Sequence, residues 1–337
     1  MFVNARMQEE DKMLPTQIRT CRAGLCAGFI FAGFFLVSCC FGADLRLGIV
    51  GTDTSHSVEF TKLFNDAASN GHVPGARVVA AFRGGRPDVA ASRDRIEQFS
   101  TELKETWHIP FVTRIAELCP LVDGILLESV DGRAHLDQFR QAVACGKPVF
   151  VDKPLASTLA DALEIDRIAA AARVPWFSSS SLRFGPVQAM RTGDVTGAFV
   201  WGPGPVEEHH QLDLSWYGIH TVEMLFTVMG TGVEQVTRND SPDADVVTGV
   251  WKGGRIGTLR VIRPYSSYGA VVYRTGGHAV VNGDVAVGYA PLLEEIVKFM
   301  RTRVPPVPNA ETLEMFRFMD AAQRSRDGGG VPISVGR

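Results

Sequence analysis

The tripeptide Asp152-Lys153-Pro154 carries the residue types in this sequence that are best suited to chemistry. An ammonium group at the end of an apolar run could hydrogen-bond a substrate hydroxyl and stabilise the alkoxide that forms as hydride leaves the carbon. The proline would make the turn rigid. A lone lysine is more often a plain surface residue, so the fold around Lys153 must decide between the two interpretations.

His220 is the second candidate, because an imidazole that titrates near neutrality can take the proton of a hydroxyl during oxidation. Tyr217 could donate a hydrogen bond to a sugar or pack in a pocket wall. Trp216 could stack on a carbohydrate ring or belong to the core. Asp213 is a further substrate-site candidate, with helix entry or a surface role as the alternatives.

The turn Gly51-Thr52-Asp53-Thr54-Ser55-His56 stands where a dinucleotide-binding fold has G-x-G-x-x-G, which brings a pyrophosphate close to a helix N-terminus. Only the first glycine is present. Asp53 brings a side chain and a negative charge to the second position, and His56 replaces the third glycine. The hydroxyls of Thr52, Thr54 and Ser55 could still bind phosphate, while Asp53 could simply cap the helix.

Apolar runs alternate with helical patterns in the first half of the chain, which predicts parallel β-α-β units and a doubly wound sheet. We expect strands at 45–50, 77–82, 109–112, 122–127, 148–151 and 174–177, and helices at 58–65, 93–107, 134–145 and 158–172. Arg83 follows the second strand, where an arginine favours the 2′-phosphate of NADP over NAD. A solvent-facing arginine is the alternative.

Beyond Arg183 the pattern changes to runs at 246–251, 257–262 and 270–273 that Gly and Pro separate, as is typical of antiparallel strands. Helices at 221–229, 291–301 and 311–326 should cover one face of this sheet. The predicted fold is α/β, with a Rossmann domain at 44–156 and an α+β domain with a largely antiparallel, open-faced sheet at 157–337. The open face favours self-association into a homo-oligomer.

The order of these motifs resembles the Gfo/Idh/MocA oxidoreductases over nearly the whole chain after Leu45. Trp216 departs from the pattern, since the family usually has an aspartate there. The similar segments are Val122-Asp123-Gly124, His135 and Gly146 to Ala156, which ends like the family's Glu-Lys-Pro motif, then Arg183-Phe184, Gly218-Ile219-His220 with Glu223, and the closing helices.

The resemblance implies an NAD(P)-dependent oxidoreductase that moves hydride at a carbinol carbon of a sugar, polyol or derivative, with NADP slightly favoured. Lys153 would lie beside the nicotinamide, and His220 would move the proton. Redox-assisted glycoside cleavage is possible at the same site. The rival hypothesis is a carbohydrate-binding or scaffold lipoprotein that kept the fold and lost the cofactor. Expected cofactor residues are Gly51, Thr52, Asp53, Thr54, Ser55, His56, Arg83, Glu128, Asp152 and Lys153, and expected substrate residues are Arg183, Asp213, Trp216 and Tyr217.

The length, charge and cysteine content of the chain indicate which classes of partner to expect. A length of 337 residues favours two domains, and a net charge of −3 gives no field that would gather nucleic acid. A small sugar-like molecule is the expected partner. The cysteines form no ligand-spaced zinc pattern, and no metal is expected. For Cys119 and Cys145 we expect two buried thiols, with a single bridge as the alternative.

The N-terminal segment 1–43 contains an uncharged run from Ala23 to Ala43, as in a signal peptide or a membrane anchor. Leu36-Val37-Ser38-Cys39 resembles a bacterial lipobox, whose cysteine is lipidated. We therefore expect a protein that is exported or membrane-anchored in a bacterium. Translation from a later start would make it cytoplasmic instead.

Overall fold

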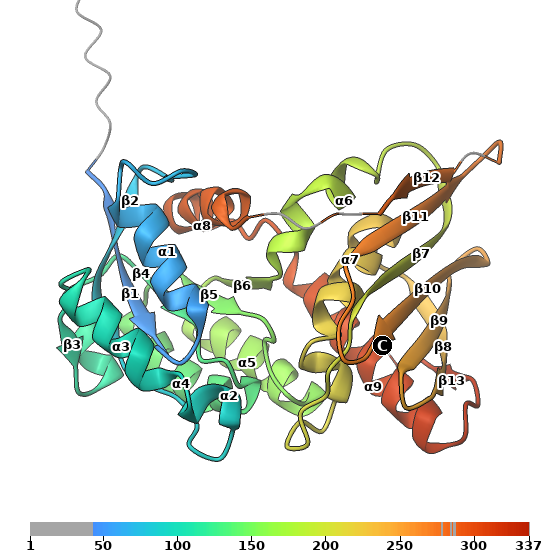
Figure 1. Ribbon diagram of the computed structural model, residues 1–337, viewed down its shortest axis with the longest axis horizontal. Coiled ribbons are helices and arrows are strands. Elements are labelled where there is room, and N and C mark those ends of the chain that lie inside the picture. The colour runs from blue at the N-terminus through green and yellow to red at the C-terminus, as the bar shows by residue number, and fades with distance from the viewer. Residues whose placement is uncertain (1–42, 278, 284, 286–287, 337) are drawn as a thin grey trace, which may run out of the picture. The chain divides into compact units, whose positions relative to one another are not determined.

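This computed structural model describes residues 43–277, 279–283, 285 and 288–336. A parallel sheet in the order β3-β2-β1-β4-β5-β6 forms the first half (Figure 1). Its topological switch point, where the strand order reverses, lies between β1 and β4. The strands are β1 (Leu45–Val50), β2 (Ala76–Phe82), β3 (Phe111–Val112), β4 (Gly124–Leu127), β5 (Val149–Asp152) and β6 (Trp176–Ser179).

Helices connect these strands much as the apolar spacing predicts. The side chain of Thr158 accepts a hydrogen bond from the backbone of Asp161 and so caps α5. Since β6 pairs with β5, the parallel sheet continues to Ser179, past residue 156. The helices are α1 (Ser55–Asn65), α2 (Ala90–Arg93), α3 (Ile96–Glu105), α4 (His135–Ala142) and α5 (Leu159–Ala172).

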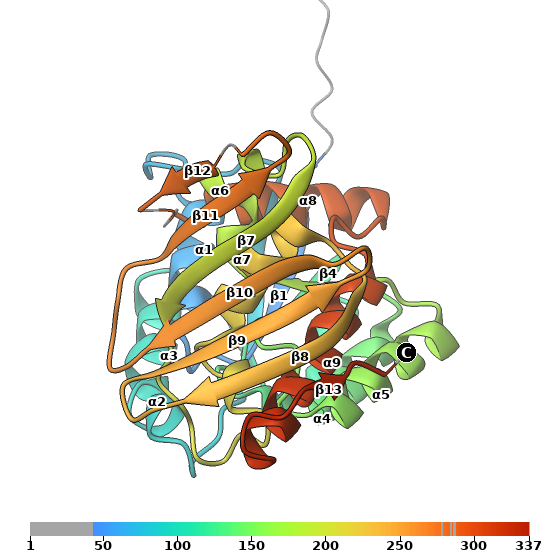
Figure 2. The ribbon, with the colours of Figure 1, turned by 90° about the vertical axis from the view of Figure 1, so that its right-hand side faces the viewer.

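The second sheet has the order β12-β11-β7-β10-β9-β8-β13, and every pair is antiparallel except β10 with β7. Helices α7 (Ile219–Met229) and α9 (Asn309–Asp327) cover one face, where Phe226, Trp251 and Phe318 pack together. Figure 2 shows the other face without a helix in front of it. The strands are β7 (Val195–Pro203), β8 (Val233–Asp240), β9 (Ala244–Trp251), β10 (Arg255–Ile262), β11 (Gly269–Arg274), β12 (Ala279–Asn282) and β13 (Ile333–Ser334), and the short α6 is Pro186–Ala189.

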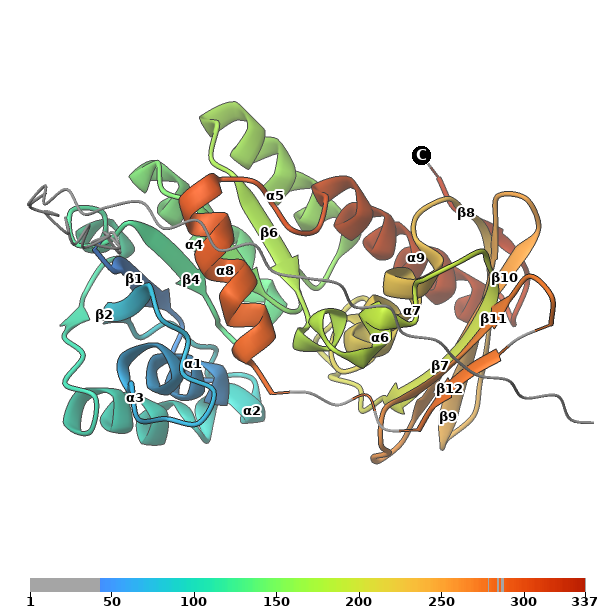
Figure 3. The same cartoon turned by 90° about the horizontal axis from the view of Figure 1, so that it is seen from above.

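One helix lies elsewhere than predicted. The sequence analysis placed 291–301 on the second sheet, but α8 (Ala290–Thr302) returns to the Rossmann sheet (Figure 3). The apolar face of α8 is buried there among residues of β1, β4 and β6, and the ring centroids of Phe299 and Phe177 are 4.8 Å apart. That helix therefore ties the C-terminal half to the N-terminal half.

The expectation of two free thiols was wrong, because Cys119 and Cys145 form a disulfide with a Cα–Cα distance of 4.8 Å. The bridge joins the turn before β4 to the end of the α4 region. The predicted signal or lipobox segment, including Cys39, lies outside the described residues. Within the described part of the chain, no helix has the length and apolar character needed to span a bilayer.

Candidate active site

A cavity of about 420 Å³ opens at the carboxyl ends of β5 and β6, between the Rossmann sheet and the second half of the chain. It brings together Lys153, which follows β5, His220 in α7, and His56 in α1. Trp216 lines it as well. Four of the five tyrosines of the sequence line the same cavity: Tyr217, Tyr265, Tyr268 and Tyr289.

His220 is held in place by a serine that the sequence analysis missed. The Nδ1 atom of His220 lies 2.7 Å from the Oγ atom of Ser180, the residue that follows β6. Burial lowers the pKa of His220 well below its usual value, and the positive charge of Lys153, together with that of His56 in its protonated form, lowers it further. The imidazole is therefore neutral, and it is a weaker base than the imidazole titrating near neutrality that the sequence predicts. Only the place of Ser180 after a parallel strand could have suggested its role.

His56 pairs with the aspartate of the Asp-Lys-Pro tripeptide, which the sequence analysis did not foresee. Its Nδ1 atom lies 2.6 Å from Oδ2 of Asp152. The imidazole stacks on Phe60 and meets the edge of Tyr289. Burial alone would raise the pKa of Asp152, but the charge and hydrogen bond of His56, together with Lys153, hold this pKa below its ordinary value. Asp152 is thus an anion that lies beside His56 and Lys153.

Asp53 does not face solvent where a phosphate would lie. Its side chain is fully buried, and Oδ1 accepts a hydrogen bond of 3.1 Å from the backbone nitrogen of Val130. This contact bridges the loops after β1 and β4. Burial raises the pKa of Asp53 despite its hydrogen bonds. Asp53 is not the N-cap of α1 either, because the side chain of Thr54 has that role.

The segment from Gly84 to Ser92 contacts both loops that flank the switch point, the loop after β1 and the loop after β4. A Cβ atom on Gly84 would lie 2.9 Å from the Cα atom of Gly51, so the two backbones are in contact. The backbone nitrogen of Thr52 donates to the carbonyl of Arg83 at 2.8 Å, which continues the pairing of β1 with β2 beyond the ends of the two strands. On the far side, Asp88 forms an ion pair of 3.0 Å with Arg133.

In a Rossmann fold a dinucleotide normally lies across the switch point. In this chain Asp53 and the segment 84–92 lie there. Asp53 and the segment 84–92 would both have to move before a dinucleotide could bind in that way. The cavity beyond them, with Ser55 and His56 at the start of α1 and Lys153 at the end of β5, stays open. The open cavity has room for a small molecule, and Asp53 and the segment 84–92 lie between the two loops that a dinucleotide would cross.

Two other residues that were expected to bind the cofactor, Arg83 and Glu128, have different surroundings in the structure. Arg83 pairs with Glu97 at 2.5 Å on the surface, which agrees with the solvent-facing alternative. Glu128 is fully buried, and neither of its carboxyl oxygens has a hydrogen-bond partner among the described residues. Burial and the nearby charge of Asp152 raise the pKa of Glu128 well above its usual value. Glu128 does not line the cavity.

The expected substrate residues divide into two groups. Trp216 and Tyr217 line the cavity, whereas Arg183 and Asp213 do not. The buried Arg183 donates to Glu223 and to Glu311, each at 2.6 Å. Asp213 accepts hydrogen bonds from Arg238 and Arg326. Both side chains are thus committed to ion pairs inside the second half of the chain.

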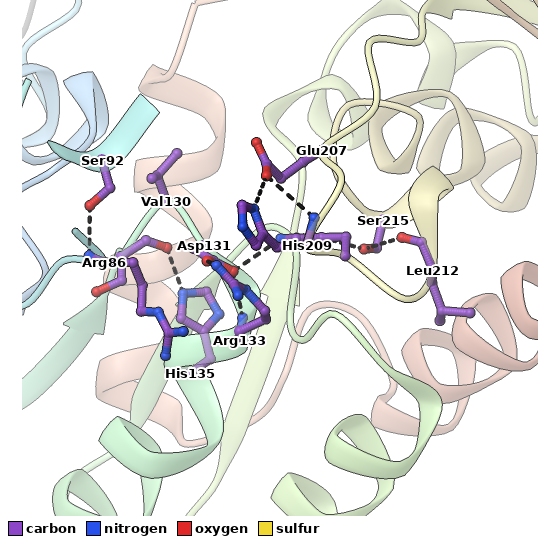
Figure 4. A network of polar contacts seen from close by, with 12 residues as sticks. Arg86, Ser92, Val130, Asp131, Arg133, His135, Glu207, His209, Leu212 and Ser215 are labelled. Atoms are coloured by element: carbon purple, nitrogen blue, oxygen red, sulfur yellow. Dashed lines mark hydrogen bonds and ion pairs between the residues drawn. The ribbon is translucent and has the colours of Figure 1, made fainter. Parts of the chain in front are cut away.

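A buried network near the cavity joins the two halves (Figure 4). Asp131, in the loop after β4, accepts hydrogen bonds from Arg133 at 2.6 Å and from the Nε2 atom of His210 at 3.0 Å. The other ring nitrogen of His210 lies 2.8 Å from Oγ of Ser215. Within the described residues, no three or more His, Cys, Asp or Glu side chains are grouped so that they could hold a metal ion.

Residues 45–178 match the model of the GFO_IDH_MocA family, described as an oxidoreductase family with an NAD-binding Rossmann fold. No curated protein matches the chain. Solved structures with the same fold include a probable dehydrogenase from Thermotoga maritima, with 20 % identity, a TM-score of 0.67, and coverage of 86 % of this chain and 99 % of that one.

Two further structures contain ligands. An oxidoreductase from Agrobacterium radiobacter in complex with NAD+, L-tartaric acid and magnesium has 16 % identity and a TM-score of 0.64, covering 87 % of this chain and 99 % of that one. The myo-inositol dehydrogenase of Lactobacillus casei, in complex with NAD(H) and myo-inositol, has 15 % identity and a TM-score of 0.67, covering 87 % and 98 %. At these identities the likeness shows the fold alone.

Proposed function

From the premise that residues 45–178 belong to the Gfo/Idh/MocA family of NAD-binding oxidoreductases, we propose that this chain oxidises or reduces a carbinol carbon of a sugar, polyol or sugar derivative. The observation that carries the proposal is the meeting of Lys153 and His220 on the wall of one cavity, although 67 positions separate them in the sequence. NAD(P) is the hydride carrier that the family implies, and Asp53 and the segment 84–92 must move to admit it.

The two residues have complementary tasks in this proposal. The ammonium group of Lys153 binds the reacting hydroxyl and stabilises negative charge on its oxygen. His220, neutral and fixed by Ser180, accepts the hydroxyl proton. Because Trp216 stands where the family usually has an aspartate, Ser180 takes over the task of fixing the histidine ring in this chain.

The walls of the cavity favour a substrate with many hydroxyl groups. Tyrosine rings offer apolar faces to the C–H groups of a sugar ring, and their hydroxyls can hydrogen-bond its oxygens. Tyr217 is 40 % exposed and Tyr265 is 69 % exposed, so both have free surface. Trp216 adds an indole to the same wall. The myo-inositol bound to the Lactobacillus casei enzyme is a molecule of this type.

A second candidate function is a carbohydrate-binding protein without a cofactor. The specific observation in its favour is the closed crevice, where Asp53 and the segment 84–92 occupy the place of the dinucleotide. The disulfide between Cys119 and Cys145 is typical of exported proteins. It supports our proposal that the protein is exported from the cytoplasm of a bacterium. Free NAD(P) is scarce outside the cytoplasm.

Denaturing the purified protein and assaying the supernatant for NAD(H) and NADP(H) tests the choice between the two candidates. Titration of the folded protein with both nucleotides, followed by tryptophan fluorescence, accompanies it. Release of a nucleotide, or binding of one that is added, would support the oxidoreductase. Neither release nor binding, combined with binding of myo-inositol, would support the carbohydrate-binding protein instead.

A further inference from the structure

We propose that His56, oriented by Asp152, is a base in the cavity that removes a proton from the carbon next to a ketone carbonyl, and that it needs no nucleotide to do so. The proposal takes its substrate class, ketones of sugars and polyols, from the proposed function. The activity itself is independent of hydride transfer. It assigns catalytic work to a residue that stands at the third glycine position of the nucleotide loop.

The contacts of His56 leave one ring nitrogen free for this task. Asp152 is an anion, so the Nδ1 atom of His56 must carry the hydrogen that lies between them. In the neutral form of the ring, which is the form that acts as a base, the Nε2 atom is unprotonated, and it has no hydrogen-bond partner among the described residues. The side chain of His56 keeps 12 % of its surface exposed and lines the cavity, whereas Asp152 is 2 % exposed. An imidazole held by a buried carboxylate is the arrangement by which enzymes fix a histidine base.

The ring is also held rigidly. Phe60 stacks on it with a centroid distance of 5.2 Å, and Tyr289 meets it edge to face at 4.8 Å. These two ring contacts and the hydrogen bond to Asp152 fix the side chain of His56 in the cavity. Burying the carboxylate of Asp152 is costly without a compensating partner, and His56 supplies that partner.

Lys153 supplies the second part of such a site. In the proposed step, Nε2 of His56 takes the proton from the carbon next to the carbonyl. The C–H electron pair forms the new C=C bond, and the electrons of the C=O bond move to the oxygen. The ammonium of Lys153 holds the resulting enolate oxygen. Return of a proton from His56 to carbon restores the ketone, so the step is balanced without an oxidant or a reductant.

The experiment follows hydrogen exchange by proton NMR. Full-length protein in D2O, without added nucleotide, is incubated with dihydroxyacetone, D-fructose or the ketone formed by oxidising one carbinol of myo-inositol. We expect loss of the signal of the hydrogen next to the carbonyl for at least one of them. His56→Ala should slow the enzymatic exchange by about 10²-fold or more. The matched control is His209→Gln, since His209 also pairs with a carboxylate, Glu207, at 2.5 Å but lies outside the cavity.

Two more variants keep the test sharp. His56→Asn can still donate a hydrogen bond toward Asp152 but has no basic nitrogen, so a folded Asn variant without exchange supports the base. Asp152→Asn should lower kcat for exchange while leaving KM within about twofold, as expected of a positioning residue. No exchange with any of the three ketones overturns the proposal. Exchange that survives His56→Ala but not His220→Ala also overturns it.

The outcome of the hydrogen-exchange experiment does not depend on the outcome of the nucleotide-release and titration experiment. A protein that binds no NAD(P) but exchanges the proton would refute the oxidoreductase and keep the base. A protein that transfers hydride but does not exchange the proton would do the reverse.

Discussion

Replacing Asp53 with glycine should make the dinucleotide crevice easier to open. The carboxylate of Asp53 accepts a hydrogen bond from the backbone of Val130 and so links the loops after β1 and β4, which a bound nucleotide would separate. A hydrogen bond from a backbone N–H to a carboxylate contributes about 1.5–3 kcal/mol. If this energy favours the closed form, Asp53→Gly shifts the equilibrium toward the open form by the same amount. We therefore expect NAD+ or NADP+ to bind about 10- to 150-fold more tightly.

Isothermal titration calorimetry with each nucleotide measures this effect. The matched control is Asp53→Asn, which keeps an oxygen that can accept from Val130 and so should leave the affinity within about threefold of the wild type. Urea unfolding of all three proteins should show Asp53→Gly to be less stable, since the bond is lost from the closed form. Equal nucleotide affinity for the wild type and Asp53→Gly would refute the view that Asp53 holds the crevice shut.

Four further predictions concern other parts of the chain. Lys153→Ala should abolish turnover and leave the nucleotide dissociation constant nearly unchanged, as stopped-flow and titration data would show. The pKa of Glu128 is raised in the folded state, so this state keeps a proton that the unfolded state loses above a pKa of about 4.5. The free energy of unfolding of the wild type should therefore fall as the pH rises above that value. Urea unfolding at several pH values should show that Glu128→Gln removes this decline. The disulfide between Cys119 and Cys145 closes a loop of 26 residues, so reducing it should lower the free energy of unfolding by about 3.5 kcal/mol. Urea unfolding with and without dithiothreitol measures this difference. Ile256 is 52 % exposed on the open sheet face, and Ile256→Lys should shift light scattering toward a smaller species.

The sequence sufficed for the six strands of the Rossmann sheet and for the part of the site that their ends create, whereas in the second sheet it predicted only β9, β10 and β11. Lys153 follows β5 directly, and carboxyl ends of parallel strands share one edge of a sheet. Three of the cavity tyrosines could not be predicted. Tyr265, Tyr268 and Tyr289 lie in or beside loops whose course depends on long-range packing. Helix α8 misled the analysis for a related reason: its apolar stripe shows that it is half-buried, but not against which sheet.

The same limit applies to the charged residues. Arg183 looked available for a substrate, since a single sequence shows no partner for it, yet Glu223 and Glu311 lie 40 and 128 positions away. Burying such a charge is possible only when partners of opposite sign are buried with it. Those partners come from α7 and α9, whose packing no local pattern encodes.

The two substitutions in the nucleotide loop act on different sides of it. Asp53 turns inward and fastens the loop to the one after β4, which closes the crevice. His56 turns toward Asp152 and the cavity, which adds a titratable group beside Lys153. Both side chains therefore have specific buried contacts. The nucleotide titration of Asp53→Gly tests the contact of Asp53 with Val130, and the exchange assay of His56→Ala tests the imidazole beside Lys153.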